Sequence, residues 1–350
     1  MATGGEALGI GVIGAGLISA YHLAGLQAAG GAAVRVVAAR TPARAAPLAR
    51  RFGVPEVVTD WRAVLDRPDI DGVVIATPDA THEEIATAAA AAGKAIMLQK
   101  PMAMSSAECR RIMAAARAAR VDLQISWMHR HFEEVVHTKE LLASGNLGPV
   151  HHVRMRNATA GPHEPWFFDR AHVAGGVVMQ LGVHGIDLTR HLFGEIETVI
   201  ATTATLRPER TFPDGRRVTS EFEDEALATY RFGGSALCSH EMSFNEAQGT
   251  DRFRLEIYCA DATLLLRSGR GPLAIYAPGV TGTRGWFTPE LPARAFGERH
   301  HARWLDILRG EIPADPTAED ALAGMLVVEA VYRSAKRRRE EAVGPVGEES

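Results

Sequence analysis

The sequence has little of what marks a secreted, disulfide-stabilised or membrane-spanning protein. Its three cysteines, Cys109, Cys238 and Cys259, are widely spaced and form no CxxC pair, which argues against a disulfide framework and a zinc finger. No apolar run approaches the roughly 18 residues that cross a membrane, and the N-terminus lacks the positive region of a signal peptide. We therefore expect a cytoplasmic protein with no membrane segment.

An excess of charge of one sign is also absent. The sequence has 38 Lys and Arg against 42 Asp and Glu, a formal net charge of −4, so nothing favours nucleic acid as a partner. The basic run 336–339 is followed directly by two glutamates and is interpreted as the solvated end of a last helix. Histidine pairs occur without a carboxylate at ligand spacing, so no metal is expected. These pairs are His129/His131, His151/His152 and His300/His301.

The length of 350 residues predicts two domains, because one hydrophobic core rarely exceeds about 250–300 residues. In residues 1–130, short apolar runs alternate with helical stretches, which predicts βαβ units and a doubly wound parallel sheet with helices on both faces. Strands are expected at 8–14, 34–39, 57–58, 73–76, 95–98 and 121–127, with helices at 17–30, 43–52, 61–66, 82–92 and 105–119.

The pattern changes after residue 130, where strands follow one another with turn residues between them. A second domain, 131–340, is therefore predicted to be α+β with a mainly antiparallel sheet, followed by a flexible tail at 341–350. Helices are expected at 132–143, 179–192, 298–309 and 318–337, with strands at 150–156, 197–206, 226–232, 235–243, 252–259 and 262–267. The Gly- and Pro-rich segment 268–298 is predicted to be a loop over a pocket or an interface.

A glycine-rich turn ends the first predicted strand and opens the first helix. Gly14 and Gly16 permit a tight turn and let a pyrophosphate approach the backbone N–H groups near Leu17 and Ile18 at the helix N-terminus. Ser19 replaces the third glycine of the fingerprint, and a small residue there still allows close packing of helix on strand. Because the motif follows a strand in a βαβ series, it predicts a dinucleotide site.

The end of the second predicted strand indicates which dinucleotide is bound. Proteins that prefer NAD usually place Asp or Glu there to hold the ribose hydroxyls, but this chain has Arg40, Thr41 and Arg44 and no carboxylate. The planar forks of two arginines can clamp a 2′-phosphate, and Thr41 can add a hydroxyl. A plainer interpretation is that both arginines decorate an exposed helix start. The pattern favours NADP, with NAD as the alternative.

Three further motifs carry a family resemblance. They are Ile75-Ala76-Thr77-Pro78 with Thr81-His82, then Gln99-Lys100-Pro101, then the glycine-rich segment 175–187. In this order and with the glycine turn, the sequence resembles the glucose–fructose oxidoreductase, inositol dehydrogenase and rhizopine-catabolism (Gfo/Idh/MocA) family over residues 8–337. The resemblance implies an N-terminal Rossmann domain for NAD(P) and a C-terminal domain whose open-faced sheet serves substrate binding and oligomerisation. It also implies oxidation of a ring CHOH in a sugar or cyclitol, or reduction of the ketone, by a homodimer or homotetramer.

The resemblance also assigns residues of the cofactor and proton-transfer site. Lys100 matches the catalytic lysine of the family, whose ammonium would hydrogen-bond the reacting oxygen and relay its proton. Gln99 stands where the family usually has glutamate, so an acceptor is kept and a charge is lost. Thr77, Pro78 and His82, together with Gln99 and Lys100, are expected to line the cofactor site.

In the long helix, Gln180 and His184 match the Asp and His of family dehydrogenases. They lie four residues apart and therefore share one helix face. His184 titrates near neutrality and can share the proton transfer or bind a substrate hydroxyl. Gln180 cannot act as a base, so proton transfer falls to Lys100 and His184. Asp187, next on that face, is expected to orient its neighbours or the substrate.

Other candidates for substrate contact are weaker. Arg130 follows the last strand of the first domain, near where the domains are expected to meet. Asn157, His163 and Trp166 lie on the strand and loop before the long helix, where the family builds its pocket wall. Trp166 can stack on a sugar face, although a packing role explains it equally well.

Three functions remain open at this point. The favoured one is an NAD(P)-dependent oxidoreductase that moves hydride between the nicotinamide and a ring CHOH or ketone, with Lys100 as proton relay and His184 assisting. A second is a family member that keeps its nucleotide bound and uses transient oxidation for elimination, epimerisation or glycoside cleavage, with which Gln180 is compatible. A third is a non-catalytic NAD(P)-sensing regulator, against which the presence of Lys100 and His184 argues.

Overall fold

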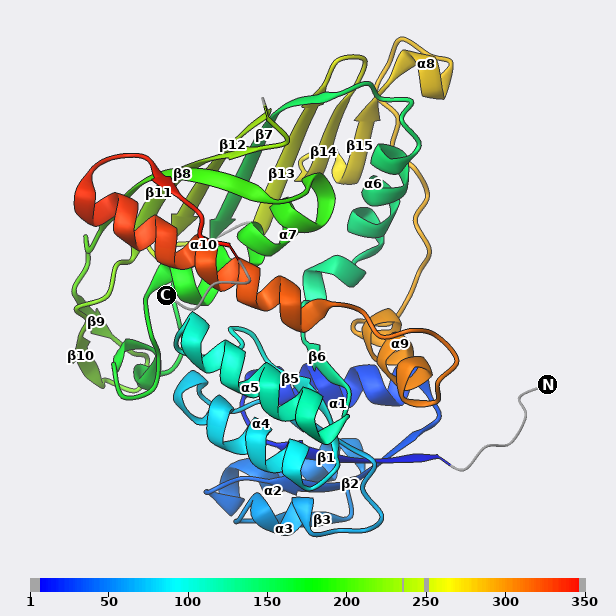
Figure 1. Cartoon of the computed structure of the whole chain (residues 1–350), viewed down its shortest axis with the longest axis vertical. Helices are drawn as coiled ribbons and strands as arrows, with labels where there is room; N and C mark the ends of the chain where they lie inside the picture. The colour runs from blue at the N-terminus through cyan, green and yellow to red at the C-terminus, as the bar shows by residue number, and fades with distance from the viewer. Residues whose placement is uncertain (1–6, 235, 249–251, 346–350) are drawn as a thin grey trace. The chain divides into compact units, whose positions relative to one another are not determined.

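The computed structural model describes residues 7–234, 236–248 and 252–345 (Figure 1). Two groups of residues on which predictions were made lie outside this range. They are residues 1–6, where a signal peptide would begin, and the last five residues of the predicted tail. The chain forms two compact units, Met1–His131 with Ala293–Leu322, and Phe132–Pro292 with Ala323–Ser350. The predicted division kept all of 131–340 in one domain, whereas residues 293–322 return to the first unit.

The first unit contains a sheet of six parallel strands. Their order is β3-β2-β1-β4-β5-β6, so the strand order reverses between β1 and β4. This is the doubly wound Rossmann arrangement, and it confirms the predicted fold class. The strands are β1 (Leu8–Ile13), β2 (Ala32–Ala38), β3 (Glu56–Val58), β4 (Gly72–Ile75), β5 (Ala95–Leu98) and β6 (Leu123–Ile125).

Helices cover this sheet, and one of them comes from the far end of the sequence. Five follow the strands in turn, namely α1 (Leu17–Ala29), α2 (Pro42–Phe52), α3 (Arg62–Leu65), α4 (His82–Ala91) and α5 (Ser106–Ala119). The sixth, α9 (Glu298–Leu308), packs on α1 and buries Trp304 and Leu305 in the same core as Ile10 and Val12. The apolar face of α9 therefore completes the first unit.

The second unit is built on an eight-stranded sheet in the order β15-β14-β13-β7-β12-β11-β8-β16. Its neighbours are antiparallel except for the parallel pair β7 and β12, as expected for a mainly antiparallel α+β domain. The strands are β7 (Val150–Ala158), β8 (Ile196–Ala204), β11 (Glu225–Phe232), β12 (Ala236–Ser243), β13 (Phe253–Cys259), β14 (Thr263–Ser268), β15 (Gly271–Tyr276) and β16 (Glu341–Ala342). A separate hairpin pairs β9 (Glu209–Thr211) with β10 (Arg217–Thr219).

Side chains alternate between the two faces of this sheet. In β11, Tyr230 and Phe232 are buried, whereas Leu227 and Arg231 are exposed. The helices α6 (Glu133–Ala143), α7 (Val183–Phe193) and α10 (Thr317–Arg337) cover the buried face, as Figure 1 shows. No described helix covers the opposite face in Figure 1, which is the pattern of a sheet with one packed face.

Two predicted irregular segments contain regular structure. Within 268–298, which was predicted to be a loop, β15 forms the edge of the large sheet and α8 (Pro278–Thr281) adds one helical turn. Pro272 obscures this strand in the sequence, but a residue without an N–H is tolerated on an edge strand. In the predicted tail, Glu341 and Ala342 pair with β8, and Glu341 bonds to Arg337 and Arg339.

In the described part of the chain, no helix combines the length and apolar character needed to cross a bilayer.

Candidate active site

The first strand ends in a turn that requires glycine. Gly14 has φ +115°, which side chains rarely adopt, and its N–H donates to the carbonyl of Ala38 at 2.8 Å. A β-carbon at this position would overlap the carbonyl oxygen of Ala76 directly after β4. The Ser19 hydroxyl donates to the carbonyl of Gly14 at 3.0 Å. This small residue therefore fastens the turn where the fingerprint has a third glycine.

The N-terminus of α1 fits a bound pyrophosphate. Gly16 is the N-cap residue, and a β-carbon built on it would meet no atom within 4 Å. No side chain caps this end, and no acidic residue lies in the first turn. Leu17 is 77% exposed. The open space beside backbone N–H groups at the positive end of a helix suits an anion.

Basic side chains gather where β2 ends. Arg40, Thr41 and Arg44 are all exposed, and Thr41 is the N-cap residue of α2. The Arg44 N–H donates to the carbonyl of Thr41 at 3.0 Å, and the first turn of α2 contains no acidic residue. Because β2 neighbours β1, these residues follow the strand next to the glycine turn, where the fold places the ribose of a dinucleotide.

His82 ties together two segments that were predicted to line the cofactor site. Its imidazole is fully buried and lies 3.0 Å from both the carbonyl of Thr77 and the carbonyl of Pro101. Burial lowers the pKa of His82, and the two carbonyls oppose this shift. Both nitrogens therefore face the backbone carbonyls of residues beside the predicted cofactor site, and the cofactor contact of His82 stays a prediction. Thr77 and Pro78 are half-buried at the end of β4.

Lys100 follows β5, and the residue before it is held firmly. Lys100 is half-buried and joined to Pro101 by a cis peptide bond. The Gln99 Nε2 lies 2.8 Å from His22 Nε2 and 3.3 Å from Ser126 Oγ, and its Oε1 accepts the N–H of Lys100 at 3.1 Å. Neither His22 nor Ser126 was singled out by sequence reasoning, because nothing local marks partners 77 and 27 residues away.

The three segments converge because β1, β4 and β5 are adjacent parallel strands. The glycine turn, Thr77 and Lys100 each follow the carboxyl end of one of them. In doubly wound sheets, ligands bind at this edge, at the point where the strand order reverses. The first unit therefore presents a cradle for a dinucleotide with an ammonium group at the same edge.

In the second unit, Gln180, His184 and Asp187 are all buried on one helical segment. Gln180 lies in a π-helical turn, Val178–Gly182, that continues into α7. The sequence predicted an ordinary helix at 179–192. A π-helical turn holds one residue more than an α-helical turn, so it rotates the side chains before it relative to those after it. Such turns are frequent at functional sites.

Glu223, which the sequence analysis missed, binds the backbone at the start of this helical segment. Its carboxylate accepts the N–H groups of Gly176 at 3.2 Å and Val178 at 3.1 Å, and the Tyr332 hydroxyl donates to it at 2.9 Å. Burial raises the pKa of Glu223, whereas these bonds oppose the shift. A β-carbon on Gly176 would overlap the carbonyl oxygen of Glu223, so the approach requires glycine.

Asn157 is fully buried beneath α7. Its Nδ2 donates to the carbonyl of Arg252 at 3.1 Å, so its Oδ1 accepts from His240 Nε2 at 2.8 Å. The other nitrogen of His240 then accepts from the Tyr230 hydroxyl at 2.8 Å. A β-carbon on Gly185 would overlap Oδ1 of Asn157. The structure thus places Asn157 under the helix that carries His184, where the sequence predicted a substrate contact.

The remaining candidates differ in their surroundings. Arg130 is buried and forms an ion pair with Asp320 at 2.7 Å within the first unit. His163 is exposed, and Trp166 is half-buried with its ring stacked on Phe167 at 3.8 Å between centroids. Among the described residues, no group of three His, Cys, Asp or Glu side chains is placed to hold a metal ion.

A Rossmann sheet with this glycine turn and edge lysine defines a dinucleotide-binding oxidoreductase. Residues 8–126 match the family described as "Oxidoreductase family, NAD-binding Rossmann fold", and residues 135–265 match the "GFO/IDH/MocA C-terminal domain". The chain belongs to the Gfo/Idh/MocA family of oxidoreductases, as its motifs indicated.

Relatives of known name support this membership. The chain is 30% identical over 285 residues to levoglucosan dehydrogenase of Pseudarthrobacter phenanthrenivorans, which covers 75% of this chain and 73% of that protein. It is 30% identical over 289 residues to inositol 2-dehydrogenase 2 of Saccharopolyspora erythraea, covering 82% and 78%. A solved levoglucosan dehydrogenase, in complex with NADH and L-sorbose, superimposes with a TM-score of 0.88 at 26% identity and covers 97% of this chain and all of that one.

The two glycines of the turn predict different effects of substitution. Gly14→Ala forces a side chain into a positive φ and against Ala76, so we expect the unfolding free energy to fall by about 1–3 kcal/mol. Gly16→Ala has open space and should leave stability unchanged, but its methyl occupies the pyrophosphate cradle and should weaken NAD(P) binding about tenfold or more. Thermal unfolding and calorimetric titration test both. Equal losses of stability in the two variants would contradict this assignment.

Proposed function

We propose that this chain is a dehydrogenase or ketoreductase that prefers NADP and acts on a ring CHOH or ketone of a sugar, sugar derivative or cyclitol. The observation that carries the proposal is the common edge of β1, β4 and β5, which bears the glycine turn and Lys100. The substrate class is supported by the names of two relatives, which are dehydrogenases of levoglucosan and inositol.

Lys100 is the proposed proton relay. When bound, the nicotinamide cofactor supplies the position that accepts or donates the hydride. In the oxidative direction, Lys100 holds the reacting hydroxyl oxygen and carries its proton away; in the reductive direction, it returns a proton to that oxygen. His184 is proposed to assist by binding a substrate hydroxyl or sharing the proton. Gln180 orients a hydroxyl without competing for the proton, since an amide does not titrate.

Further contacts are proposed on each unit. The stacked rings of Trp166 and Phe167 offer an aromatic face to a sugar ring, and His163 supplies a polar contact beside it. Asp187 and Arg130 are assigned to orienting substrate or neighbouring groups. Asn157 acts from beneath α7 and supports the helix that carries His184.

The NADP preference rests on the end of β2. Two exposed arginines and a threonine stand where a carboxylate would hold the ribose of NAD, and a guanidinium fork matches phosphate geometry. A solved relative contains NADH. The cofactor preference is therefore a point at which we expect this chain to differ from that relative.

The double variant Arg40→Ser/Arg44→Ser tests this preference. We expect the wild-type protein to have the higher kcat/KM with NADP⁺, and the variant to lose about tenfold or more of it while turnover with NAD⁺ is unchanged. Arg50→Ser, an exposed arginine in the last turn of the same helix, is the matched control. Turnover of the wild-type protein with NAD⁺ alone would refute the NADP assignment and leave the enzyme class intact.

Lys100→Met tests the reaction itself. Loss of the proton relay should lower kcat by about 10²–10⁴-fold while cofactor affinity remains, whereas the exposed Lys336→Met should be fully active. The assay offers sugars, cyclitols and sugar lactones and follows the reduced nicotinamide by absorbance. Full activity of Lys100→Met would refute the relay. Absence of turnover in wild-type protein that retains its nucleotide would favour internal redox chemistry, with elimination, epimerisation or glycoside cleavage as the outcome.

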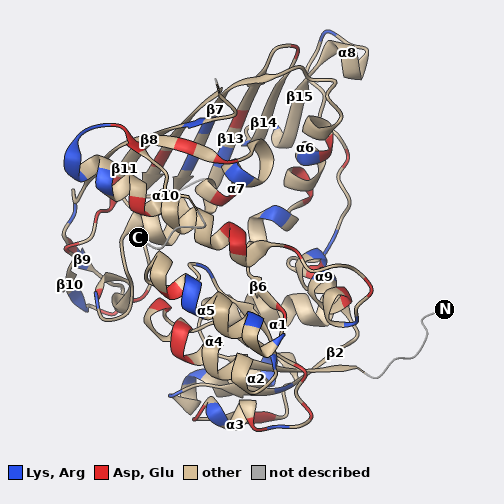
Figure 2. Cartoon of the chain, in the orientation of Figure 1, with Lys and Arg blue, Asp and Glu red and all other residues tan. Residues whose placement is uncertain are grey.

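We also propose a homodimer or homotetramer formed through the open face of the large sheet. Ile200 is 52% and Leu227 58% exposed on that face, on neighbouring strands. Charged residues of both signs are interspersed along the strands of this sheet (Figure 2), and the exposed side chains of Arg154 and Glu256 form an ion pair at 3.5 Å. A face with apolar and paired charged groups can complement a second copy of itself.

Leu227→Glu should therefore dissociate the oligomer, because it places a charge on the proposed interface. Sedimentation equilibrium measures the result. Leu206→Glu is the control, since Leu206 is 64% exposed outside the regular strands of that sheet. A wild-type protein that sediments as a monomer would contradict the proposal.

A further inference from the structure

A chain of hydrogen bonds runs through the first unit to the residue before Lys100. The His301 Nδ1 lies 2.7 Å from the carbonyl of Gly297, and its Nε2 lies 2.9 Å from His22 Nδ1. The His22 Nε2 lies 2.8 Å from Gln99 Nε2, and Gln99 Oε1 accepts the N–H of Lys100 at 3.1 Å. Residues of α9, α1 and the loop after β5 are thus linked in one line.

The two ends of this line determine where every proton lies. A carbonyl only accepts, so His301 carries its proton on Nδ1, and in the neutral ring Nε2 is then an acceptor. His22 must therefore donate from Nδ1, which leaves its own Nε2 as an acceptor for the Gln99 amide. The N–H of Lys100 independently requires Gln99 Oε1 at the other end. The amide orientation and both tautomers therefore agree.

The surroundings keep both histidines neutral. His22 and His301 are fully buried and Gln99 is 5% exposed. Burial, and the proximity of His301, lower the pKa of His22 well below its usual value. Burial also lowers the pKa of His301 to about 4, against the opposing effect of the Gly297 carbonyl. Gly25 makes room for the line, since a β-carbon there would overlap His301 Nδ1.

We propose that Gln99 is a positioning residue for Lys100, held by a one-directional relay of the two neutral histidines His22 and His301. The relay fixes the carboxamide, and the carboxamide fixes the backbone from which the Lys100 side chain extends. This inference rests on the proposed function only through the role of Lys100.

The relay explains why position 99 is an amide. A carboxylate there cannot donate to His22 Nε2. To bind a carboxylate, His22 would have to donate from Nε2 and accept at Nδ1, and His301 would have to donate from Nε2. The lone pair of His301 Nδ1 would then face the carbonyl oxygen of Gly297, which is unfavourable. A glutamate at position 99 is therefore accommodated only if the pair it forms with His22 takes up a proton.

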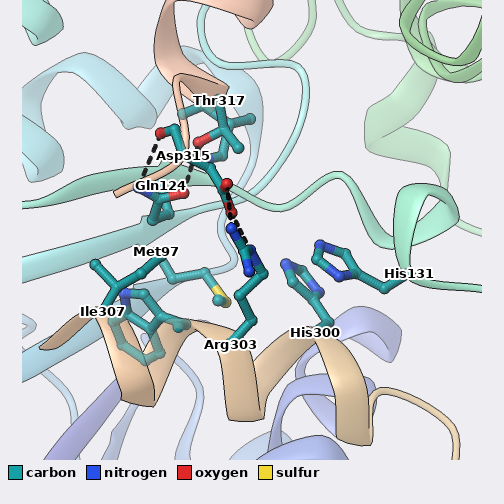
Figure 3. A pocket seen from close by; sticks show the side chains of 10 residues that line it. Met97, Gln124, His131, His300, Arg303, Ile307, Asp315 and Thr317 are labelled. Carbon is teal, nitrogen blue, oxygen red and sulfur yellow. Dashed lines mark hydrogen bonds and ion pairs between the residues drawn. The ribbon is translucent and has the colours of Figure 1, made fainter. Parts of the chain in front are cut away.

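Other titratable groups lie close but outside the relay. The His300 ring bonds through Nδ1 to the Tyr21 hydroxyl at 2.9 Å and stacks on His131 at 4.4 Å. Figure 3 shows His131 and His300 face to face beside Arg303, which pairs with Asp315. Arg130 also faces His131. His300 lies on α9 directly before His301 and is buried like it, so it is a matched control.

The first measurement is ¹⁵N NMR of the full-length protein with labelled histidine, from pH 6 to 9. The relay requires His22 and His301 each to carry one proton, on Nδ1, throughout this range. A proton on Nε2 of either ring, or a doubly protonated ring at pH 7, would overturn the relay. This measurement requires no enzymatic activity.

The second measurement compares variants of similar shape. Gln99→Met removes the bonds and should lower kcat about ten- to hundredfold through misplacement of Lys100, with KM for the cofactor unchanged. His300→Gln should keep wild-type kcat. A wild-type kcat in Gln99→Met, or an equal loss in His300→Gln, would overturn the positioning role. Full activity of Lys100→Met would instead refute the proposed function, while the NMR result would still decide the relay.

Gln99→Glu supplies a pH signature that a simple packing defect does not have. Its folded state holds an extra proton that the unfolded glutamate releases above its ordinary pKa of about 4.3. Stability contributed by that proton is present at low pH and lost as the pH rises. The unfolding equilibrium constant relative to wild type should thus increase about tenfold per pH unit between pH 6 and 8. A pH-independent difference would overturn the relay.

Discussion

The close approach of Gly14 to the carbonyl of Ala76 is the constraint on which the first unit depends. It places the ends of β1 and β4 side by side where the strand order reverses, and it directs the chain into α1 with its N-terminus open. The turn after β2 and the loop after β5 then reach the same edge because their strands neighbour these two. The open N-terminus of α1 thus depends on one backbone contact that only a residue without a β-carbon permits, and the pairing of β5 with β4 brings Lys100 to the same edge.

Each unit places a fully satisfied polar network beneath a proposed functional residue. In the first, His22 and Gln99 support Lys100; in the second, His240 and Asn157 lie under the helix that carries His184. Buried polar groups are unfavourable unless every donor and acceptor is paired, so such networks favour one arrangement of the chain over its alternatives. Glycines at the closest approaches, Gly25 and Gly185, make both networks sterically possible.

Local features of the sequence predicted the parts of the fold that depend on local physics. The apolar run 95–98 coincides with β5, and the glycine turn lies between strand and helix as expected. What failed depends on partners distant in sequence. The amphipathic pattern of α9 predicts one buried face but does not say which unit that face packs against. Nothing local in the sequence therefore indicates that residues 293–322 belong to the first unit. Likewise, Gln99 meets His22, and His22 meets His301, only through tertiary packing. Pro272 conceals β15 because edge pairing is not visible in the sequence.

Two amides, Gln99 and Gln180, stand where the family resemblance led us to expect acids. An amide orients its neighbours through a donor and an acceptor, but it neither holds a charge nor exchanges a proton. Among the residues assigned to the reaction, proton transfer is therefore confined to Lys100 and His184. At position 99 this neutrality is coupled to distant positions, because the amide needs an acceptor at His22 and His22 needs one at His301. A carboxylate at position 99 would reverse the donor and the acceptor in both of the bonds that follow, from Gln99 to His22 and from His22 to His301. The three positions therefore behave as one unit, and an acid at position 99 requires either an extra proton shared with His22 or a different partner at position 22 or 301.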